Sequence, residues 1–424
     1  MLGLYDKMEI LDISPKTIDE IETSNRRDRW YYFIYCVWCF MENIAVTNFR
    51  SILGVPINVI DEIVSYFVLF SLVIFIILRV RFNMIQLLTV VLSSLVIVIV
   101  TIRSGNNHMI SLWLFIVASK NVDIHKVFSI TIRVVLVVLL LTTVSSVVGI
   151  IPDYLYYRGD LVRHAMGYGH VNVLGMKVFQ LVVYYTMLFY RTGEGMRRLY
   201  LIIIVSALFV YMVPNSITPV ILLSVLFVLL FIWNSIQVNR VAMTIFMNAL
   251  VLGATMTNAF SLYFCMREFQ NKGFFGVMNR FLSSRFSLSH IAYKDLGITI
   301  WGQRAYISNI ERMKAGLHGG YFLDNTYMIL LVRYGVIFFC AFSCIYILAM
   351  VRLTRKGMFI VTIVYFIYAV YGLMEPSMYR FAYNTTLVFL SIVFYGDVIW
   401  SHDSHQSRIP FKVMFKMPIR VITR

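Results

Sequence analysis

Charged residues are scarce in this sequence, and their scarcity excludes most soluble folds. Only 14% of the 424 residues are charged and 60% are apolar, whereas soluble proteins are about a quarter charged and about half apolar. The apolar residues form continuous runs, such as 74–78, 95–100 and 134–141, instead of the spaced pattern of an amphipathic helix. The sequence therefore predicts an all-α polytopic membrane protein.

Signals of several soluble function classes are also missing. The five cysteines lie in or beside apolar segments, and the C-x-x-C pair of Cys36 and Cys39 has no second pair or histidine cluster to complete a metal site. No basic run is interleaved with aromatic residues, which argues against a nucleic-acid partner. Residues 1–29 are polar and mixed in charge, so we expect no cleavable signal peptide.

The apolar runs predict about twelve membrane spans, since a span needs about 20 mostly apolar residues. Windows 109–119, 199–213 and 220–234 are short, and a polar turn at 214–219 separates the last two. The predicted spans are 30–48, 59–78, 84–102, 109–119, 127–151, 170–190, 199–213, 220–234, 241–264, 328–351, 358–374 and 382–400.

The basic residues orient these spans, because cytoplasmic segments of membrane proteins carry an excess of Lys and Arg. With the N-terminus inside, 21 of the 37 basic residues fall in cytoplasmic segments and 5 in short outer segments. The sequence therefore predicts that both termini lie in the cytoplasm. The predicted parts are a cytoplasmic N-terminal segment (1–29), nine transmembrane helices (30–264), an extracytoplasmic helical loop (265–324), three transmembrane helices (325–400) and a basic cytoplasmic tail (401–424).

The long loop combines amphipathic stretches with positive charge. Stretches 277–294 and 304–315 are amphipathic, so we expect short helices over the membrane. Residues 267–314 hold 8 basic and 3 acidic residues, a local excess of +5 on the side that the topological bias leaves poor in positive charge. We interpret this excess as a site for an anionic ligand.

Three polar segments are predicted to meet on the outer face: 163–175, 277–327 and 371–384. Spans that are far apart in sequence direct these segments to one compartment. Such convergence is typical of an active site at the membrane surface.

Cationic side chains in these segments are candidate phosphate ligands. Arg163, Arg280 and Arg285 each offer a fixed fork of N–H donors that matches phosphate oxygens. The alternative is that these arginines lie on solvated loops or touch lipid headgroups. His170 and Lys177 share a helix face, and Lys177 either snorkels to the headgroups or faces a polar cavity.

Two carboxylates are candidates for proton transfer. Asp324 precedes a predicted span, where it either caps the helix or acts as a general base. Glu375 lies at a helix end and has the same two interpretations. Asn172 is suited to cap the sixth span, and Arg333 either pairs with an acidic group in a polar cleft or snorkels.

Four stretches resemble motifs of the Wzy-type polysaccharide polymerases of Gram-positive capsule and exopolysaccharide systems, in the O-antigen polymerase/ligase superfamily. Residues 163–175 are similar to the pattern R-x-x-LGF-x-HPN-x-x-G, and 279–303 to N-x-LL-SGR-x-x-L … LFGQ. Residues 323–335 are similar to hydrophobic-DNSYL … YG, and 371–384 to YG-hydrophobic-x-EP … YN. The motifs occur in the family's order and cover most of 155–395.

The sequence departs from these patterns at three places. Residues 170–172 read His-Val-Asn instead of His-Pro-Asn, 283–285 read Ser-Ser-Arg instead of Ser-Gly-Arg, and 324–326 read Asp-Asn-Thr instead of Asp-Asn-Ser. The change from proline removes backbone stiffness, and the change from glycine removes the residue best suited to a tight turn. Every candidate functional group is retained.

The resemblance implies a GT-C-like fold and a metal-independent glycosyltransferase without a cofactor. Such polymerases use undecaprenyl-diphosphate-linked oligosaccharide repeats at the outer face of the bacterial cytoplasmic membrane. A growing glycan passes from one lipid carrier to a sugar hydroxyl on the next, which requires a general base and positive charge near the departing diphosphate. The implied partners are membrane lipids and the flippase and chain-length regulator of the same pathway.

The resemblance also implies roles for the matching residues. Asp324 takes the place of the general base, with Glu375 as the alternative base. The arginines are expected to engage the diphosphate, while the others shape the site. The residues expected to bind substrate are Arg163, His170, Asn172, Arg280, Arg285, Asn325, Tyr327, Arg333 and Asn384.

Two other functions stay open. A flippase or transporter of lipid-linked oligosaccharides is the main rival, although the paired repeats and midplane charges typical of such carriers are not evident in the sequence. A ligase that attaches finished glycan to another acceptor shares the fold and the donor chemistry of a polymerase.

Overall fold

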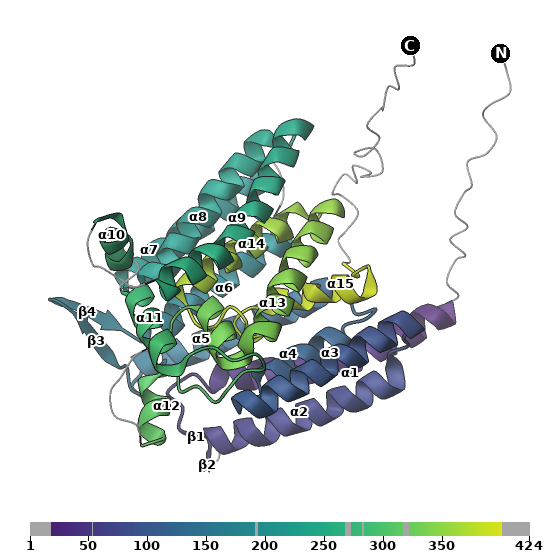
Figure 1. The fold of residues 1–424 in the computed structure, drawn as a ribbon, viewed down its shortest axis with the longest axis horizontal. Coiled ribbons are helices and arrows are strands. Elements are labelled where there is room, and N and C mark those ends of the chain that lie inside the picture. The colour runs from purple at the N-terminus through teal and green to yellow at the C-terminus, as the bar shows by residue number, and fades with distance from the viewer. Residues whose placement is uncertain are drawn as a thin grey trace.

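The computed structural model describes residues 18–52, 54–190, 194–267, 273–281, 284–316 and 322–400. Among these residues, eight helices are long and apolar enough to cross a membrane, which confirms a polytopic helical membrane protein. These helices, drawn in Figure 1, are α2 (Ile57–Arg79), α3 (Met84–Ser104), α5 (Ile124–Val147), α6 (Val171–Phe189), α7 (Glu194–Met212), α8 (Ile217–Ile236), α9 (Arg240–Met266) and α13 (Thr326–Arg355).

The other four predicted spans coincide with helices of a different kind. The first falls on α1 (Ile18–Ile44), whose first half carries many charged residues. The remaining three fall on shorter apolar helices: α4 (His108–Ala118), α14 (Phe359–Met374), and the 3-10 helix η1 (Thr385–Leu390) with α15 (Ser391–Tyr395). The total of twelve spans therefore stays a prediction.

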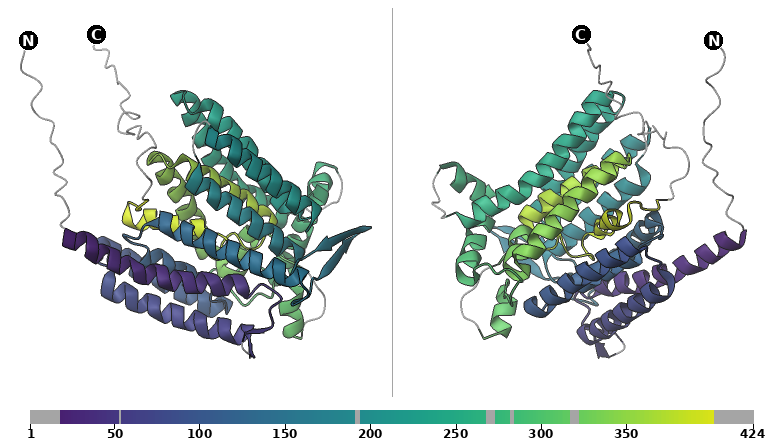
Figure 2. Two further views of the ribbon diagram at one scale, coloured as in Figure 1. Left: turned by 180° about the vertical axis from the view of Figure 1, so that it is seen from behind. Right: turned by 45° about the vertical axis from the view of Figure 1, so that its right-hand side comes forward.

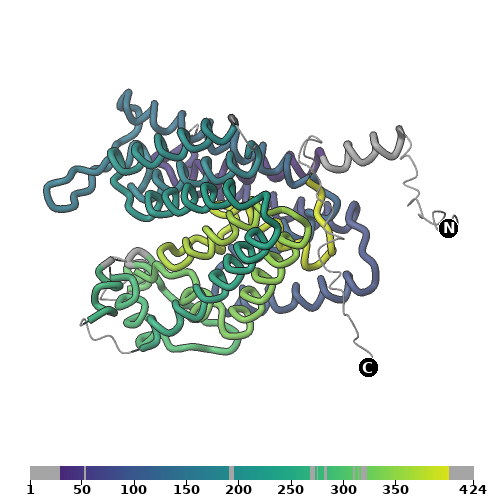
Figure 3. The backbone as a smooth tube through the Cα atoms, turned by 90° about the horizontal axis from the view of Figure 1, so that it is seen from above, coloured from purple at the N-terminus to yellow at the C-terminus, as the bar shows by residue number. Residues whose placement is uncertain are grey.

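Short elements gather at one end of the bundle, which we call the hairpin end (Figures 1 and 2). Strands β3 (Leu155–Arg158) and β4 (Leu161–His164) form an antiparallel hairpin that projects from this end, as Figure 3 shows. Strands β1 (Ser51–Ile52) and β2 (Val55–Pro56) form a shorter antiparallel pair. The helices of the hairpin end are α10 (Gly273–Phe281), α11 (Arg285–Leu296) and α12 (Asn309–Lys314).

The segment between α9 and α13 contains these three short helices among its described residues.

Helix α15 and the beginning of α1 lie at the opposite end of the bundle (Figure 1). The side of the membrane that each end faces, and with it the predicted outer position of 265–324, stays a prediction.

The helices differ in how much of their surface is buried within the protein. Helix α14 packs against α6, α8, α9 and α13, and most of its side chains are buried. In contrast, only 22% of the most apolar stretch of α2 and 17% of that of α3 is buried within the protein. The large apolar faces that α2 and α3 expose suit contact with lipid chains.

Helix α13 is interrupted at Gly335, which has a left-handed φ of +87°. A Cβ atom on Gly335 would lie 2.3 Å from the backbone nitrogen of Gly302, and one on Gly302 would lie 2.7 Å from the Arg333 carbonyl oxygen. The backbone N–H of Gln303 donates to the same Arg333 carbonyl over 2.9 Å. Two backbones therefore cross at a distance that only glycine permits, and two of the motif-bearing stretches pack directly on each other.

Candidate active site

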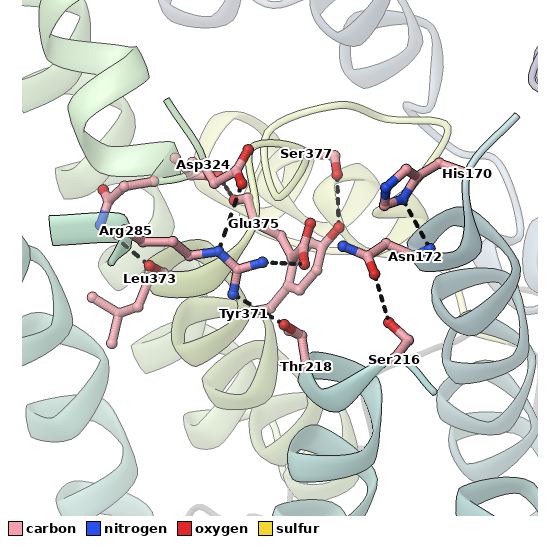
Figure 4. Close-up of polar contacts among 12 residues, drawn as sticks. His170, Asn172, Ser216, Thr218, Arg285, Asp324, Tyr371, Leu373, Glu375 and Ser377 are labelled. Carbon is pink, nitrogen blue, oxygen red and sulfur yellow. Dashed lines mark hydrogen bonds and ion pairs between the residues drawn. The ribbon is translucent and has the colours of Figure 1, made fainter. Parts of the chain in front are cut away.

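Arg285 lies at the centre of a polar cluster at the hairpin end (Figure 4). Its Nη2 atom donates to Glu375 Oε1 over 3.0 Å, and its Nη1 atom donates to Thr218 Oγ1 over 3.1 Å. Its Nε atom lies 3.7 Å from Asp324 Oδ2. One guanidinium thus joins α8, α11, the segment before α13 and the end of α14, so the two predicted bases and one predicted phosphate ligand come together.

The three charged side chains differ in their access to solvent. The side chains of Arg285 and Glu375 are 11% and 9% exposed, whereas that of Asp324 is 33% exposed. Asp324 is therefore the carboxylate that a molecule entering the cluster would meet first.

Burial shifts the titration of both carboxylates. It raises the pKa of Glu375 to about 7, although the charge of Arg285 opposes the rise and that of Asp324 adds to it. Burial also raises the pKa of Asp324, again against the charge of Arg285. A carboxyl that titrates near neutral pH beside a charged partner is a common feature of catalytic sites.

A tight turn positions Arg285 at the start of α11. Ser284 has φ +63° and ψ +18°, a left-handed conformation that is costly for any residue except glycine. The Ser284 N–H donates to the Asn279 carbonyl over 2.7 Å, and the Asn279 side chain accepts from the Ser287 N–H over 3.2 Å. The turn therefore forms with serine at the place where the family's pattern has glycine.

The start of α13 and the end of α14 are clamped together. Thr326 Oγ1 donates to the carbonyl oxygen of Glu375 over 2.7 Å. Asn325 is fully buried and caps α13, because its side chain accepts from the Met328 N–H over 3.0 Å and from Ser261 Oγ over 2.7 Å. The Thr326 bond ties the chain beside Asp324 to the backbone of Glu375, while the predicted contact of Asn325 with substrate stays a prediction.

A second polar group surrounds Asn172 at the start of α6. Asn172 Oδ1 accepts from Arg163 Nη2 over 3.2 Å and from Ser216 Oγ over 3.1 Å. Arg163 Nε also donates to the Pro214 carbonyl over 3.0 Å. His170 caps the helix, since its Nδ1 atom accepts from the Asn172 N–H over 3.1 Å. Three predicted substrate ligands therefore hold one another and the turn before α8.

The turn at 214–219 links the two groups. Ser216 contacts Asn172, and two residues later Thr218 contacts Arg285. Figure 4 shows both groups in one region, with Tyr371 between them. The sequence predicts this turn only as a connector between two spans, and neither hydroxyl is among the expected site residues. The feature of the sequence that could have indicated these two hydroxyls is the polarity of this short turn, which is predicted to lie on the same side of the membrane as the motifs.

Tyr327 and Asn384 lie in the packed interior. The Tyr327 hydroxyl donates to the Ala369 carbonyl over 2.6 Å, and Asn384 Nδ2 donates to the Met378 carbonyl over 2.9 Å. Both side chains are buried. They support the framework around α14, and their predicted contacts with substrate stay predictions.

Arg333 and Arg280 lie in different surroundings. Arg333 is buried in α13, where its Nη2 atom donates to Glu311 Oε2 over 2.6 Å and its Nε atom to the Ala305 carbonyl over 3.1 Å. It therefore pairs with an acidic group instead of snorkelling. Arg280 is exposed on α10, and among the described residues it makes no hydrogen bond or ion pair with the Arg285 cluster.

Lys177 faces the protein interior and does not snorkel. Its side chain is buried, and its Nζ atom lies 4.3 Å from the centre of the Tyr383 ring and 3.5 Å from Gln180 Oε1. A buried lysine in a membrane helix requires polar or aromatic neighbours of this kind.

The described part of the chain contains no group of three or more His, Cys, Asp or Glu side chains that is placed to hold a metal ion. Whether the chemistry is independent of metal stays a prediction. No protein-family model matches the chain, and no curated protein or solved structure is significantly similar to it. A functional assignment therefore depends on the contacts above and on the resemblance of the motifs.

Proposed function

We propose that this chain is a Wzy-type glycosyltransferase that polymerises undecaprenyl-diphosphate-linked oligosaccharide repeats into a capsular polysaccharide or exopolysaccharide. The reaction takes place at the outer face of a bacterial cytoplasmic membrane, with both termini of the chain inside. One observation carries the proposal: Arg285 lies between Asp324 and Glu375 in a polar cluster at one end of a membrane bundle.

The cluster contains the groups that glycosyl transfer from a diphosphate requires. Asp324 accepts the proton of the acceptor hydroxyl as the hydroxyl oxygen bonds to the anomeric carbon of the donor. The bond from that carbon to the diphosphate oxygen breaks, and its electron pair stays on the diphosphate. Arg285 stabilises the added negative charge, and burial strengthens this interaction because water is excluded.

The proton on Glu375 controls how much charge Arg285 offers. An ionised Glu375 occupies the Nη2 atom of Arg285 and offsets its charge. A protonated Glu375 leaves the full positive charge for the diphosphate. Because burial raises the pKa of Glu375 to about 7, both states are populated near neutral pH. Glu375 is also the alternative base, although its lower exposure favours Asp324.

The group around Asn172 forms the other wall of the proposed site. Arg163 uses its Nε hydrogen and one Nη2 hydrogen to hold Pro214 and Asn172, so its Nη1 hydrogens and the second Nη2 hydrogen are left to meet the diphosphate. His170 caps the start of α6. Asn172 bonds to Ser216 and so holds the turn that leads to Thr218.

Purified full-length protein in lipid nanodiscs, supplied only with a lipid-linked repeat unit, tests this proposal. A ladder of products that differ by one repeat is the expected result. No product until another acceptor is added would identify a ligase and contradict the proposal. Transfer of the lipid across the bilayer without new glycosidic bonds would identify a flippase and contradict it too.

A further inference from the structure

The β3–β4 hairpin has two faces with different surroundings. Its strands pair Tyr156 with Arg163 and Tyr157 with Val162. Paired residues of an antiparallel sheet point to the same face, and neighbours along a strand point to opposite faces. Tyr156 and Arg163 therefore share one face, which we call the inner face. Tyr157, Val162 and Leu155 share the other, which we call the outer face.

The inner face is fixed to the protein. The Tyr156 hydroxyl donates to the Gly169 carbonyl over 2.8 Å, and the Tyr156 ring meets the ring of His170 at 4.7 Å. Arg163 is buried and donates to Asn172, as described above. The inner face is thus part of the polar group around Asn172.

The base of the hairpin is tied down as well. Asp153 Oδ1 accepts from the Met166 N–H over 2.6 Å, and Asp153 Oδ2 lies 2.6 Å from His164 Nδ1. The Ala165 N–H donates to the Tyr154 carbonyl over 3.2 Å. These bonds fix the direction in which the hairpin projects from the bundle (Figure 2).

The outer face, in contrast, is apolar and exposed. Leu155, Tyr157 and Val162 are 46%, 70% and 46% exposed. The fourth side chain of this face is His164, which is paired with Asp153. An exposed apolar patch on a firmly held element is typical of an interaction surface.

The exposed stripe of α5 leads into this face. Leu140, Val144 and Val147 follow one another at helical spacing, and each is more than half exposed. Ile150, just beyond the end of α5, is also more than half exposed. Only a few residues of chain then separate Ile150 from β3, so the apolar surface of a spanning helix continues to the base of the hairpin.

The exposed stripe of α7 ends at the same place. Leu201, Val205, Leu208 and Met212 are more than half exposed at helical spacing, and only 22% of the most apolar stretch of α7 is buried. The His164 N–H, in β4, donates over 3.2 Å to the carbonyl of the residue that follows Met212. Because the apolar surfaces of two spanning helices end where the outer face begins, the bilayer is a better partner for this face than another protein.

The backbone of the hairpin limits how deep the outer face can lie. The sheet has two strands, so each strand has an outer edge of backbone N–H and C=O groups that the other strand does not pair. Hydrocarbon offers these groups no hydrogen bonds, whereas the headgroup region offers water and lipid oxygens. Tyrosine is enriched in the headgroup region, and Tyr157 is the most exposed residue of the outer face.

We propose that the outer face of the hairpin, formed by Leu155, Tyr157 and Val162, lies on the headgroup region of the phospholipid bilayer. The hairpin then connects the bilayer surface to Arg163 and the group around Asn172. Contact with lipid thus holds this group in position from outside the bundle. The contact itself does not depend on the proposed function.

Photocrosslinking of the full-length protein in nanodiscs of phosphatidylglycerol and phosphatidylcholine tests this contact. Tyr157 is replaced by p-benzoylphenylalanine, which bonds to a nearby C–H group under ultraviolet light, and intact mass spectrometry identifies the adduct. We expect an adduct with the mass of one phospholipid. The matched control carries the same residue at Leu161, which is exposed on the inner face, and should lack this adduct. The same residue at Tyr66, exposed on the spanning helix α2, is the positive control.

Three outcomes would overturn the inference. A crosslink from position 157 to a second copy of the chain would assign the outer face to a protein interface. No adduct at position 157, with a lipid adduct at position 66, would show that water covers the outer face. Equal yields of lipid adduct at positions 157 and 161 would show that the hairpin has no lipid-facing side.

Hydrogen exchange in the same nanodiscs tests the contact without a crosslinker. Val162→Ser removes an apolar side chain from the outer face, so the amides of the hairpin should exchange about three- to tenfold faster than in the wild type. Leu161→Ser changes the neighbouring exposed residue on the inner face and should keep the wild-type rate. Equal exchange rates in the two variants would overturn the proposal, whether or not the protein makes polymer.

Discussion

Arg285 donates to Glu375 over 3.0 Å across 90 positions of sequence. Because Arg285 begins α11 and Glu375 ends α14, this bond ties the segment between α9 and α13 to the central helix of the bundle. Both side chains are largely buried, and removing one partner of a buried ion pair leaves the other charge unpaired. A ligand that takes Arg285 must therefore bring negative charge in place of Glu375.

The first prediction concerns the general base. Asp324→Asn keeps the size of the side chain and removes its ability to take a proton, so we expect polymerisation to fall by about 10²–10⁴-fold. The rate is measured as ladder formation by purified protein with a lipid-linked repeat unit. Asp160→Asn, in the exposed turn of the hairpin, is the control and should keep the wild-type rate. A wild-type rate for Asp324→Asn would exclude Asp324 as the base.

The second prediction is a pH dependence of binding. The pKa of Glu375 is about 7, so Glu375 is neutral below this pH and ionised above it. Affinity for the sugar-diphosphate lipid should therefore fall as the pH rises through about 7, because ionised Glu375 competes for Arg285. Arg285, Asp324, Thr218, Tyr371 and Tyr383 are the polar groups that face Glu375.

The control for this dependence is Glu375→Gln, which is neutral at every pH. A diphosphate diester is fully ionised throughout this pH range and its charge does not change. The change of affinity with pH therefore reports on groups of the protein. Binding is measured by isothermal titration in nanodiscs between about pH 6 and pH 8. Equal slopes for the wild type and Glu375→Gln would show that another group is responsible.

The third prediction tests a residue that the sequence analysis missed. Thr218→Val preserves shape but removes the hydroxyl that accepts from Arg285 Nη1 over 3.1 Å. Loss of one such bond is worth about 0.5–1.5 kcal/mol, so affinity for the diphosphate lipid should fall by about 2–12-fold. Thr255→Val, whose hydroxyl bonds only within its own helix α9 among the described residues, is the control. Equal affinities for both variants would remove Thr218 from the site.

The membrane class was predictable because hydrocarbon thickness sets the length of a span, and long apolar runs are unambiguous. Eight predicted windows coincide with helices of that length. Window 358–374 coincides with α14, which is short and enclosed by other helices. A buried helix and a spanning helix have similar composition, so hydropathy alone does not separate them.

The site was predictable only in part, for a different reason. Charge and topology placed Arg285, Asp324 and Glu375 in segments that converge, but pairing between side chains depends on packing that a sequence does not display. Motif resemblance also does not separate a ligand contact from a framework contact. Asn325 and Asn384 illustrate this, because the structure gives both of them buried bonds to the protein.

The fourth prediction concerns the turn before Arg285. Relief of the left-handed strain at Ser284, about 1–2 kcal/mol, exceeds the added flexibility cost of glycine, about 0.5–1 kcal/mol. Ser284→Gly should therefore raise the free energy of unfolding by about 0.5–1 kcal/mol and retain activity. Ser284→Val should lower it, because a branched residue tolerates this conformation poorly. Thermal unfolding in detergent measures both, and a lower melting temperature for Ser284→Gly would contradict the strain argument.

The last prediction concerns the point where the backbone of α13 at Gly335 crosses the backbone of residues 300–303. A Cβ atom on Gly335 would lie 2.3 Å from the Gly302 nitrogen and 2.6 Å from the Ile300 carbonyl oxygen, where only backbone atoms are available to move. Gly335→Ala should therefore destabilise the protein by more than about 3 kcal/mol. Because the crossing holds the chain that follows α11, trypsin should then cleave between α11 and α13 faster than in the wild type. Gly169→Ala is the control, since its Cβ would lie 3.8 Å from its nearest neighbour, the Val46 carbonyl oxygen. Equal melting temperatures for Gly335→Ala and Gly169→Ala would show that the crossing relaxes without cost.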